Sequence, residues 1–259
     1  LGSLLCLCGQ AQMYASGKGV EIDYARAKAL YEQALAAGCV EANEGLGEMY
    51  LYGKGVEVDG RKAVACLEKG LDTDDLIFLN RALTSLARVY KEGIGVEQDN
   101  EKALEMYRIA AETGDSSSCS NLGDCYYYGD LVEQDYAEAI KWYEKAAEKG
   151  NTYDLAVCYY EGKGVERDYG KAMELFLQSL TSGVSNMSTG ANKAFLKIGY
   201  MYEKGWGVGQ DYVTALDWYL KGARDGDPTC MRNAAIYYQY GWGTEKNWAR
   251  AAENRRSEE

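Results

Sequence analysis

A short glycine-rich turn recurs along the whole chain, and its periodicity restricts the fold more than any other feature. The first copy is Gly17-Lys18-Gly19-Val20, and the first glycines of the seven copies are Gly17, Gly53, Gly93, Gly129, Gly162, Gly205 and Gly241. The intervals between them are 36, 40, 36, 33, 43 and 36 residues. Such a period is typical of arrays of stacked structural repeats. The chain of 259 residues is therefore interpreted as one array of repeats.

The fifth copy, Gly162-Lys163-Gly164, has an alternative interpretation as an anion-binding loop. Exposed backbone N–H groups and a helix N-terminus both attract phosphate. The fuller phosphate-loop pattern, which has a wider glycine spacing followed by Lys-Ser/Thr, is absent. Because the turn occurs seven times, we interpret it as architecture, and we expect no cofactor.

Residues at fixed distances from each turn glycine predict two helices per repeat. A tyrosine stands three residues before the glycine in every copy, and a leucine or isoleucine usually stands four residues before the tyrosine, which is the spacing of one helix face. An aspartate stands six residues after the glycine in six copies, as the expected N-cap of a second helix. These aspartates are Asp23, Asp59, Asp99, Asp135, Asp168 and Asp211.

We therefore predict an all-α, right-handed superhelix of about seven helical-hairpin repeats. The approximate repeat boundaries are 1–38, 39–74, 75–114, 115–150, 151–183, 184–226 and 227–259. Repeat five is three residues short in its first helix, and repeat six has seven extra residues within 181–193. That segment predicts an exposed loop. It contains Asn186-Met187-Ser188, which matches a glycosylation sequon, but such triplets often arise by chance and this one does not assign a lumenal location.

Composition argues against several classes of function. The formal net charge is −12, so we expect no nucleic-acid partner, because phosphates would be repelled. No apolar run approaches the length of a membrane span, so we expect no membrane insertion. The chain has no histidine, which removes histidine bases and histidine metal ligands. We expect no metal site.

The eight cysteines fall at small or apolar repeat positions, without any Cys-x-x-Cys pair. Cys125 and Cys158 share a position with methionines, Cys66 shares one with leucine and tryptophan, and Cys6 and Cys230 share one with alanines. A thiol packs there as a small hydrophobic group. Unpaired cysteines favour a reducing, cytoplasmic location, while a secreted or lumenal location stays open.

The repeat resembles the Sel-one-like repeat family, relatives of the tetratricopeptide repeats. The segment LGDCYYYGDLVEQDYAEAIKWYEKAAEKG, residues 122–150, carries the family pattern almost throughout. The resemblance covers nearly the whole chain and implies a solenoid that acts as a non-catalytic adaptor or scaffold for protein or peptide partners. The disulfide-paired subgroup of the family has cysteines eight positions apart, and no pair here has that spacing.

The resemblance to tetratricopeptide repeats also implies which residues line a concave, partner-binding groove. They stand nine, five, two and one residues before the turn glycine. The selected candidates are Tyr52, Arg88, Asp124, Tyr127, Tyr128, Tyr160, Tyr200, Glu203 and Tyr240. This tyrosine-lined groove with acidic members suits a peptide or protein segment carrying basic residues. Packing of the same tyrosines between repeats is the alternative.

Trp206 and Trp242 occupy the middle of their turns, where lysines stand in other copies. They predict either an exposed aromatic edge or packing against the neighbouring turn. Clustered tyrosine and tryptophan leave open a carbohydrate-binding or cell-envelope module as an alternative function. A hydrolase using carboxylate pairs, such as Asp74-Asp75 or Glu44 and Glu48, is a third alternative, although no spacing demonstrates a catalytic pair.

Overall fold

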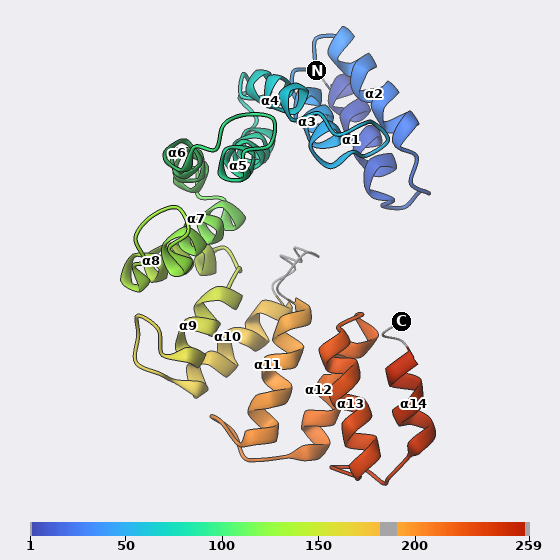
Figure 1. Ribbon diagram of the computed structural model, residues 1–259, viewed down its shortest axis with the longest axis vertical. Helices are drawn as coiled ribbons and strands as arrows, with labels where there is room; N and C mark the ends of the chain where they lie inside the picture. The colour runs from blue at the N-terminus through green and yellow to red at the C-terminus, as the bar shows by residue number, and fades with distance from the viewer. Residues whose placement is uncertain (1, 182–190, 257–259) are drawn as a thin grey trace. The chain divides into compact units, whose positions relative to one another are not determined.

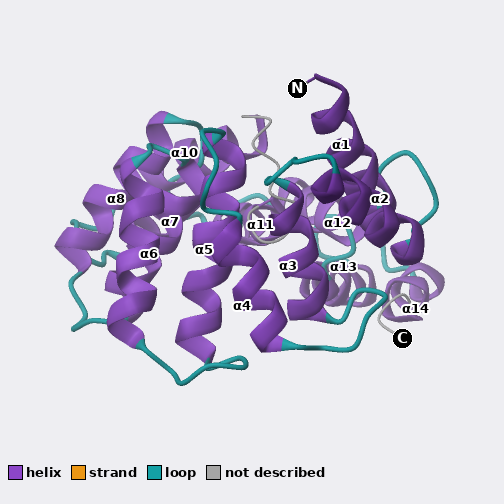
Figure 2. Ribbon diagram, turned by 90° about the horizontal axis from the view of Figure 1, so that it is seen from above, coloured by secondary structure: helices purple, strands orange, loops and turns teal. Residues whose placement is uncertain are grey.

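The computed structural model describes residues 2–181 and 191–256, with side chains for 7–181 and 193–254, and this part of the chain consists of helices and loops without strands (Figures 1 and 2). The described residues form fourteen helices, one pair per repeat. The pairs are α1 (Gly2–Ser16) and α2 (Tyr24–Ala36), α3 (Ala42–Tyr52) and α4 (Gly60–Lys69), α5 (Leu76–Glu92) and α6 (Asn100–Glu112), α7 (Ser116–Tyr128) and α8 (Tyr136–Glu148), α9 (Tyr153–Glu161) and α10 (Tyr169–Thr181), α11 (Ala191–Lys204) and α12 (Tyr212–Arg224), and α13 (Pro228–Tyr240) and α14 (Trp248–Arg256).

The helices group into two compact units, Leu1–Gln134 and Asp135–Glu259. Unit 1 contains α1 to α7 and unit 2 contains α8 to α14. Within each unit, every helix packs against the helix that follows it in the chain, as the chain-order colours of Figure 1 show. First helices of adjacent repeats also touch, namely α1 with α3, α3 with α5, and α11 with α13. Stacking of nearest neighbours is the packing of a helical-hairpin array, and it confirms the predicted fold class.

In the turns of repeats two, three, five, six and seven, which each contain two glycines and follow another repeat, the two glycines have different roles. The first ends the first helix in a left-handed conformation, for example Gly53 at φ +67° and Gly162 at φ +71°, a region that a β-carbon penalises. The second lies against the preceding repeat. A Cβ on Gly207 would stand 2.6 Å from the carbonyl carbon of Tyr169, at the start of α10. The turn therefore holds neighbouring repeats together.

The aspartate N-caps are confirmed. The side chain of Asp59 accepts a hydrogen bond from the amide of Lys62 at 3.0 Å, and the caps at 23, 99, 135, 168 and 211 accept equivalent bonds. The cap amide also donates to the carbonyl of the recurring tyrosine, as between Asp59 and Tyr50 at 3.0 Å. In the seventh repeat Asn247 replaces the aspartate and accepts from the amide of Arg250 at 3.0 Å.

Small residues allow the helices to approach closely. The alanines four residues after each cap are all buried, and they are Ala27, Ala63, Ala103, Ala139, Ala172, Ala215 and Ala251. Glycine does the same in first helices, since a Cβ on Gly199 would stand 2.5 Å from the ring of Tyr219.

The cysteines also occupy small or apolar positions of the repeats. The six at 8, 39, 119, 125, 158 and 230 are buried, Cys66 is half-buried, and none of these seven is in a disulfide. The side chain of Cys6 lies outside the described residues.

The expected irregularities fall in repeats five and six. Helix α9 has 9 residues, whereas α7 and α13 have 13, which confirms the shortened first helix. Most of the predicted exposed loop, including Asn186-Met187-Ser188, lies outside the described residues. Among the helices in the described ranges, none combines the length and apolar character needed to cross a bilayer.

Candidate partner-binding surface

Three of the predicted groove residues occupy one repeat position and are strongly exposed. Tyr52, Tyr128 and Tyr240 each precede the turn glycine, at the C-terminal ends of α3, α7 and α13. They retain 41%, 66% and 54% of their surface exposed. Large side chains that stay exposed can contribute apolar area and a hydroxyl group to an interface. Tyr52 and Tyr128 are therefore the exposed aromatic residues of the candidate surface in unit 1, and Tyr240 is the one at the equivalent repeat position in unit 2.

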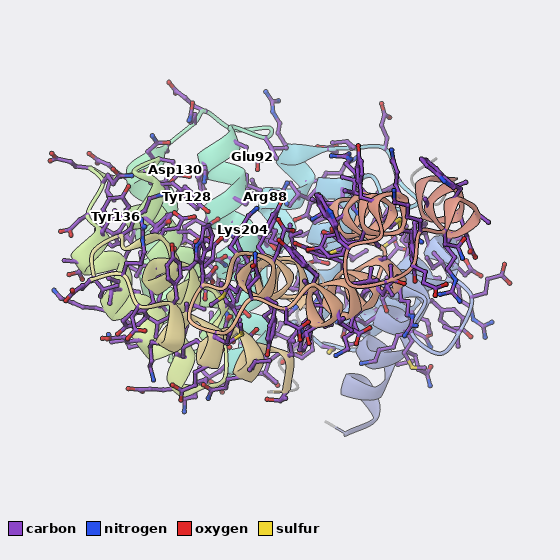
Figure 3. The ribbon with its side chains drawn as sticks, turned by 90° about the horizontal axis from the view of Figure 1, so that it is seen from below. Arg88, Glu92, Tyr128, Asp130, Tyr136 and Lys204 are labelled. Carbon is purple, nitrogen blue, oxygen red and sulfur yellow. The ribbon has the colours of Figure 1, made fainter. Side chains whose placement is uncertain are left out.

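Tyr52 lies among charged side chains. Arg88 Nη1 donates to the Tyr52 hydroxyl at 3.2 Å, and the guanidinium carbon stands 5.3 Å from the ring centroid. Lys54 Nζ lies 5.2 Å from the same centroid. Arg88 also forms an ion pair with Glu92 across 2.8 Å, and Figure 3 labels both residues. Arg88 therefore holds Tyr52 in place by two contacts that a partner would have to accommodate.

Near Tyr128, one of two adjacent tyrosines is buried. Tyr127 keeps only 6% of its surface exposed, and Tyr128 contacts it edge-on with ring centroids 5.0 Å apart. Asp124, one turn earlier, is half-buried. The Lys91 side chain of α5 pairs with Asp130 in the turn after α7. Tyr128 thus offers contact area, whereas Tyr127 packs inside unit 1.

An enclosed carboxyl group lies earlier on the same face. Glu44 is 1% exposed, and Arg81 Nη2 stands 2.9 Å from its Oε1 and 3.8 Å from Oε2 of Glu48. Burial raises the pKa of Glu44 to about 8, opposed by Arg81 and assisted by the Glu48 carboxylate. Lys54 approaches Glu48 to 4.0 Å. Four acidic residues of this face, at 44, 48, 92 and 130, therefore have cations of the chain beside them.

In unit 2, Glu203 is the centre of a hydrogen-bonded network. Its Oε2 accepts from the hydroxyl groups of Tyr219 at 2.8 Å and Tyr237 at 3.0 Å, while Lys204 lies 2.7 Å from its Oε1. Burial disfavours the ionised form, but the bonds from Lys204 and the two tyrosines outweigh it, so the pKa of Glu203 is lowered. The predicted groove residue Glu203 is thus engaged by α12 and α13, and Tyr200 contacts Tyr219 edge-on at 6.0 Å.

Tyr160 belongs to an aromatic cluster that spans repeats five and six. Its ring lies 5.7 Å from that of Tyr169 and 5.8 Å from that of Trp206. Lys197 Nζ stands 4.5 Å from the Tyr160 centroid. Burial raises the pKa of Tyr160 to about 12 and lowers that of Lys197. Tyr160 is therefore partly enclosed between repeats.

Both turn tryptophans stack on the preceding repeat. Trp206 is parallel to Tyr169, with an interplanar angle of 9° and centroids 5.1 Å apart. Trp242 stacks on Tyr212 at 6.2 Å and on Tyr240 at 5.4 Å, and it keeps 43% of its surface exposed. Packing against the neighbouring repeat therefore accounts for both tryptophans, and Trp242 is also an exposed aromatic edge.

The sequence carries a signal for this stacking. The residue directly after the aspartate cap is a tyrosine in the repeats that precede both tryptophans, namely Tyr169 and Tyr212. Lys163, which stands at the tryptophan position of repeat five, lies 5.8 Å from the ring of Tyr136 at the equivalent place. Figure 3 labels Tyr136. In these three repeats the middle residue of the turn contacts the tyrosine that follows the previous cap, whereas Lys54 of repeat two lies over the ring of Tyr52.

The described residues contain no cluster of metal-ligand type, and they form an open pocket away from the predicted groove residues. No group of three or more His, Cys, Asp or Glu side chains in the described ranges could hold a metal ion. An open pocket between α12, α13 and α14 has a volume of about 470 Å³ and is lined by Arg224, Tyr238, Arg250 and Glu253 among others. Its lining contains none of the predicted groove residues.

Comparisons with known proteins agree with the repeat count. A family model, the Sel1 repeat, matches residues 5–39, 40–72, 80–115, 116–151, 152–184, 194–227 and 228–253. Among solved structures, c5321, a protective antigen present in uropathogenic Escherichia coli strains, displays an SLR fold and is 29% identical with a TM-score of 0.71. That match covers 98% of this chain and 53% of the antigen.

Two further relatives extend the comparison. A Sel1 repeat protein from Oxalobacter formigenes is 28% identical with a TM-score of 0.66, and the match covers 83% of this chain and 81% of that one. Chitin synthase regulatory factor 3 of Schizosaccharomyces pombe (strain 972) is 26% identical over 154 residues, which are 59% of this chain and 16% of the factor. The chain thus spans a small part of that curated relative. Because the family model matches most of its length in seven repeats, the chain belongs to the Sel1 repeat family.

Proposed function

We propose that this protein is a non-catalytic adaptor that binds a protein or peptide partner through the first helices of its repeats. The observation that carries the proposal is the exposure of Tyr52, Tyr128 and Tyr240 at one repeat position. Stacking of the repeats does not require tyrosine there, because the other repeats carry serine, glutamate or lysine. Exposed tyrosines on a rigid scaffold favour partner contacts, since they supply large area at low entropic cost.

The charge of the surface suggests how a partner is recognised. The net charge of −12 attracts basic segments over a distance and accelerates their encounter. Close to the surface, however, acidic residues such as Glu48 and Glu92 already have cations of the chain beside them. We therefore propose that the tyrosines supply most of the binding affinity. The overall negative charge speeds the approach of a basic segment. The regulatory role named for one relative supports a binding function.

As part of the adaptor proposal, we infer that the carboxylate pairs Asp74-Asp75 and Glu44-Glu48 do not catalyse hydrolysis. Asp75 caps α5 by accepting a hydrogen bond from the amide of Ile77 at 2.9 Å. Glu44 is enclosed and paired with Arg81. Neither pair therefore presents two carboxylates to a substrate. Reproducible hydrolysis of a glycoside or ester that is abolished by Glu44→Gln would contradict this part of the proposal.

Selection of peptides tests the proposal without a known partner. The immobilised full chain selects from a random peptide display library, and the affinity of enriched peptides is then measured by calorimetry. The combined substitution of Tyr52, Tyr128 and Tyr240 by alanine should weaken binding at least tenfold, as expected when interface tyrosines are truncated. Added salt should slow association more than it speeds dissociation.

The matched control is Trp248→Ala. Trp248 is an aromatic residue with 64% exposure on a second helix, α14, so its loss removes exposed aromatic area outside the candidate surface, comparable with that of one of the three tyrosines. We expect it to leave peptide affinity unchanged. Equal binding by the triple variant and the wild type, with folding retained by circular dichroism, would overturn the proposal.

One observation favours a second candidate, a carbohydrate-binding surface in unit 2. Tyr212, Trp242 and Tyr240 form a continuous run of stacked, partly exposed rings, and aromatic faces of this kind can pack against sugar rings. A glycan array separates the candidates. Glycan binding that is lost in Trp242→Ala supports the carbohydrate surface, whereas peptide selection dependent on Tyr52 and Tyr128 in unit 1 supports the adaptor.

A further inference from the structure

Two thiols lie against each other at the junction of the first two repeats. Cys8 belongs to α1, and Cys39 lies in the segment between α2 and α3. Their Sγ atoms are 3.2 Å apart, although 31 residues separate them in the chain. Both are buried, at 2% and 4% exposure, in a core cluster that includes Ala11 and Ala42.

We propose that Cys8 and Cys39 form a disulfide under oxidising conditions and thereby lock the first helix of repeat one to the start of repeat two. A disulfide has an S–S length of about 2.05 Å, so the two sulfur atoms need to approach by only about 1 Å. Other thiols are engaged differently. Cys119 donates to the carbonyl of Ala111 at 3.4 Å, and Cys125 donates to that of Asn121 at 3.2 Å.

The oxidant that this step needs is a low-molecular-weight disulfide such as oxidised glutathione. One cysteine thiolate attacks a sulfur of the oxidant, forms a mixed disulfide and releases one thiolate. The second cysteine thiolate then attacks the protein-bound sulfur, closes the Cys8–Cys39 bond and releases the second thiolate. Two electrons pass from the cysteines to the oxidant, and the two protons of the cysteine thiols are taken up by the released thiolates.

The surroundings make this reaction slow in the folded protein. Burial raises the pKa of Cys8 to about 12, and the neighbouring Cys39, Glu41 and Glu44 add to the shift. Burial also raises the pKa of Cys39, whose thiol donates to Glu41 Oε2 at 3.1 Å. Because the thiolate is the attacking species, the bond should form over hours or during folding, and then persist because reductants have equally poor access.

The consequence for the array is a covalent link between neighbouring repeats. The bond would close a loop that contains the whole of α2 and join α1 to the residues that precede α3. A cross-link of this length restricts the unfolded chain and so favours the folded state. Opening of the first repeat, which has a neighbour on one side only in the described array, would become harder.

Disulfide mapping tests the proposal on the full chain. The reduced protein is refolded in a glutathione redox buffer, remaining thiols are alkylated, and digested peptides are analysed by mass spectrometry. We expect one linked pair containing Cys8 and Cys39, two hydrogen atoms lighter than the separate peptides, with the other six cysteines alkylated. The melting temperature of the oxidised protein should exceed that of the reduced protein, and it should return to the reduced value after unfolding in denaturant with dithiothreitol and refolding under reducing conditions.

Variants separate this bond from general oxidation. Cys8→Ser and Cys39→Ser should each abolish the linked peptide and the oxidation-dependent rise in melting temperature. Alanine versions serve if serine impairs folding, because the cluster already contains alanines. Cys66→Ser, at a half-buried cysteine, should retain both signals. Complete alkylation of Cys8 and Cys39 in the refolded wild type, or a bond made through Cys6 instead, would overturn the proposal.

Discussion

A carboxyl group enclosed as completely as that of Glu44 makes the stability of unit 1 depend on pH. The unfolded chain releases this proton near pH 4.5, and the folded protein releases it near 8 because burial raises the pKa. Between these values the folded state binds more protons than the unfolded state. The contribution of Glu44 to the free energy of unfolding is therefore complete below pH 4.5. It declines as the pH rises to 8, by at most about 1.4 kcal/mol per pH unit.

Glu44→Gln should remove this decline. The amide is neutral at every pH and still fits beside Arg81, so the unfolding free energy of the variant should change less between pH 4.5 and 8 than that of the wild type. Urea unfolding at both ends of that range measures the difference. Glu57→Gln is the matched control at an exposed position, and it should keep the wild-type slope. If Glu44→Gln also kept the wild-type dependence of the unfolding free energy on pH, the prediction would be wrong.

Glu203 has the opposite pH dependence. Its pKa is lowered, so its stabilising contribution is present above the unfolded value of 4.5 and is lost as the pH falls through the folded value. Tyr219→Phe should cost about 1.5 to 3 kcal/mol at neutral pH, the usual worth of a hydrogen bond to a charged group. That cost should shrink in acid, where the carboxylate is protonated.

A double-mutant cycle with Glu203→Gln isolates the bond from the loss of the hydroxyl itself. The measured quantity is the unfolding free energy of the single and double variants. We expect a coupling energy between positions 203 and 219 and almost none between Glu203 and Tyr240, an exposed tyrosine of the same unit, whose replacement by phenylalanine serves as the control. If Tyr219→Phe cost the same in the Glu203→Gln background as in the wild type, the two side chains would not be directly bonded.

At the scale of the turn and its two helices, Gly207→Ala should destabilise unit 2. Gly207 has φ +71°, and an added Cβ would stand 2.6 Å from the Tyr169 backbone, so the substitution introduces strain and separates two repeats. We expect a loss of roughly 1 to 3 kcal/mol, the range for overpacking. Gly209 provides the control, because nothing lies within 4 Å of a Cβ there and its φ is ordinary. Thermal unfolding of Gly209→Ala should match the wild type.

The elements were predictable from sequence because each depends on local chemistry. The left-handed turn glycines and the aspartate caps recur at fixed spacing, and the alanine after each cap is buried wherever the sequence places it. Which side chains of the first helices are buried and which are exposed was less predictable. Tyr127 and Tyr128 are adjacent and chemically identical, yet 6% and 66% exposed, because one helical step turns the first into the core and the second to solvent.

The same limit applies to Glu203. Its position before the turn glycine suggested a partner contact, but the hydroxyl groups that engage it come from residues 16 and 34 positions further along the chain. A repeat pattern defines which positions share a face, and it does not define which long-range polar partners fill the space above them. The exposed aromatic position was therefore within reach of sequence analysis, whereas the Glu203 network and the Cys8–Cys39 contact required the structure.

At the scale of the whole chain, stability should spread between neighbours rather than through one common core. Each helix within a unit packs mainly on the helices next to it in sequence, so a local defect weakens adjoining repeats first. Gly207→Ala, which strains the contact between α10 and the turn after α11, should raise amide hydrogen exchange in α9 to α13. The amides of α1 to α5 should exchange as in the wild type.

The expected increase in hydrogen exchange is confined to the repeats near Gly207, and the alternative is an equal increase along the whole array. Local opening needs to break only the contacts of the weakened repeats, so its free energy falls there and not elsewhere. Exchange measured by mass spectrometry of peptides resolves each helix, and Gly209→Ala supplies the reference pattern. If exchange rose equally from α1 to α13 in Gly207→Ala, the array would unfold as a single cooperative block, and binding at Tyr52 would then be coupled to every defect near Trp206. A confined response means instead that the two units can be altered separately while each retains its own contact surface.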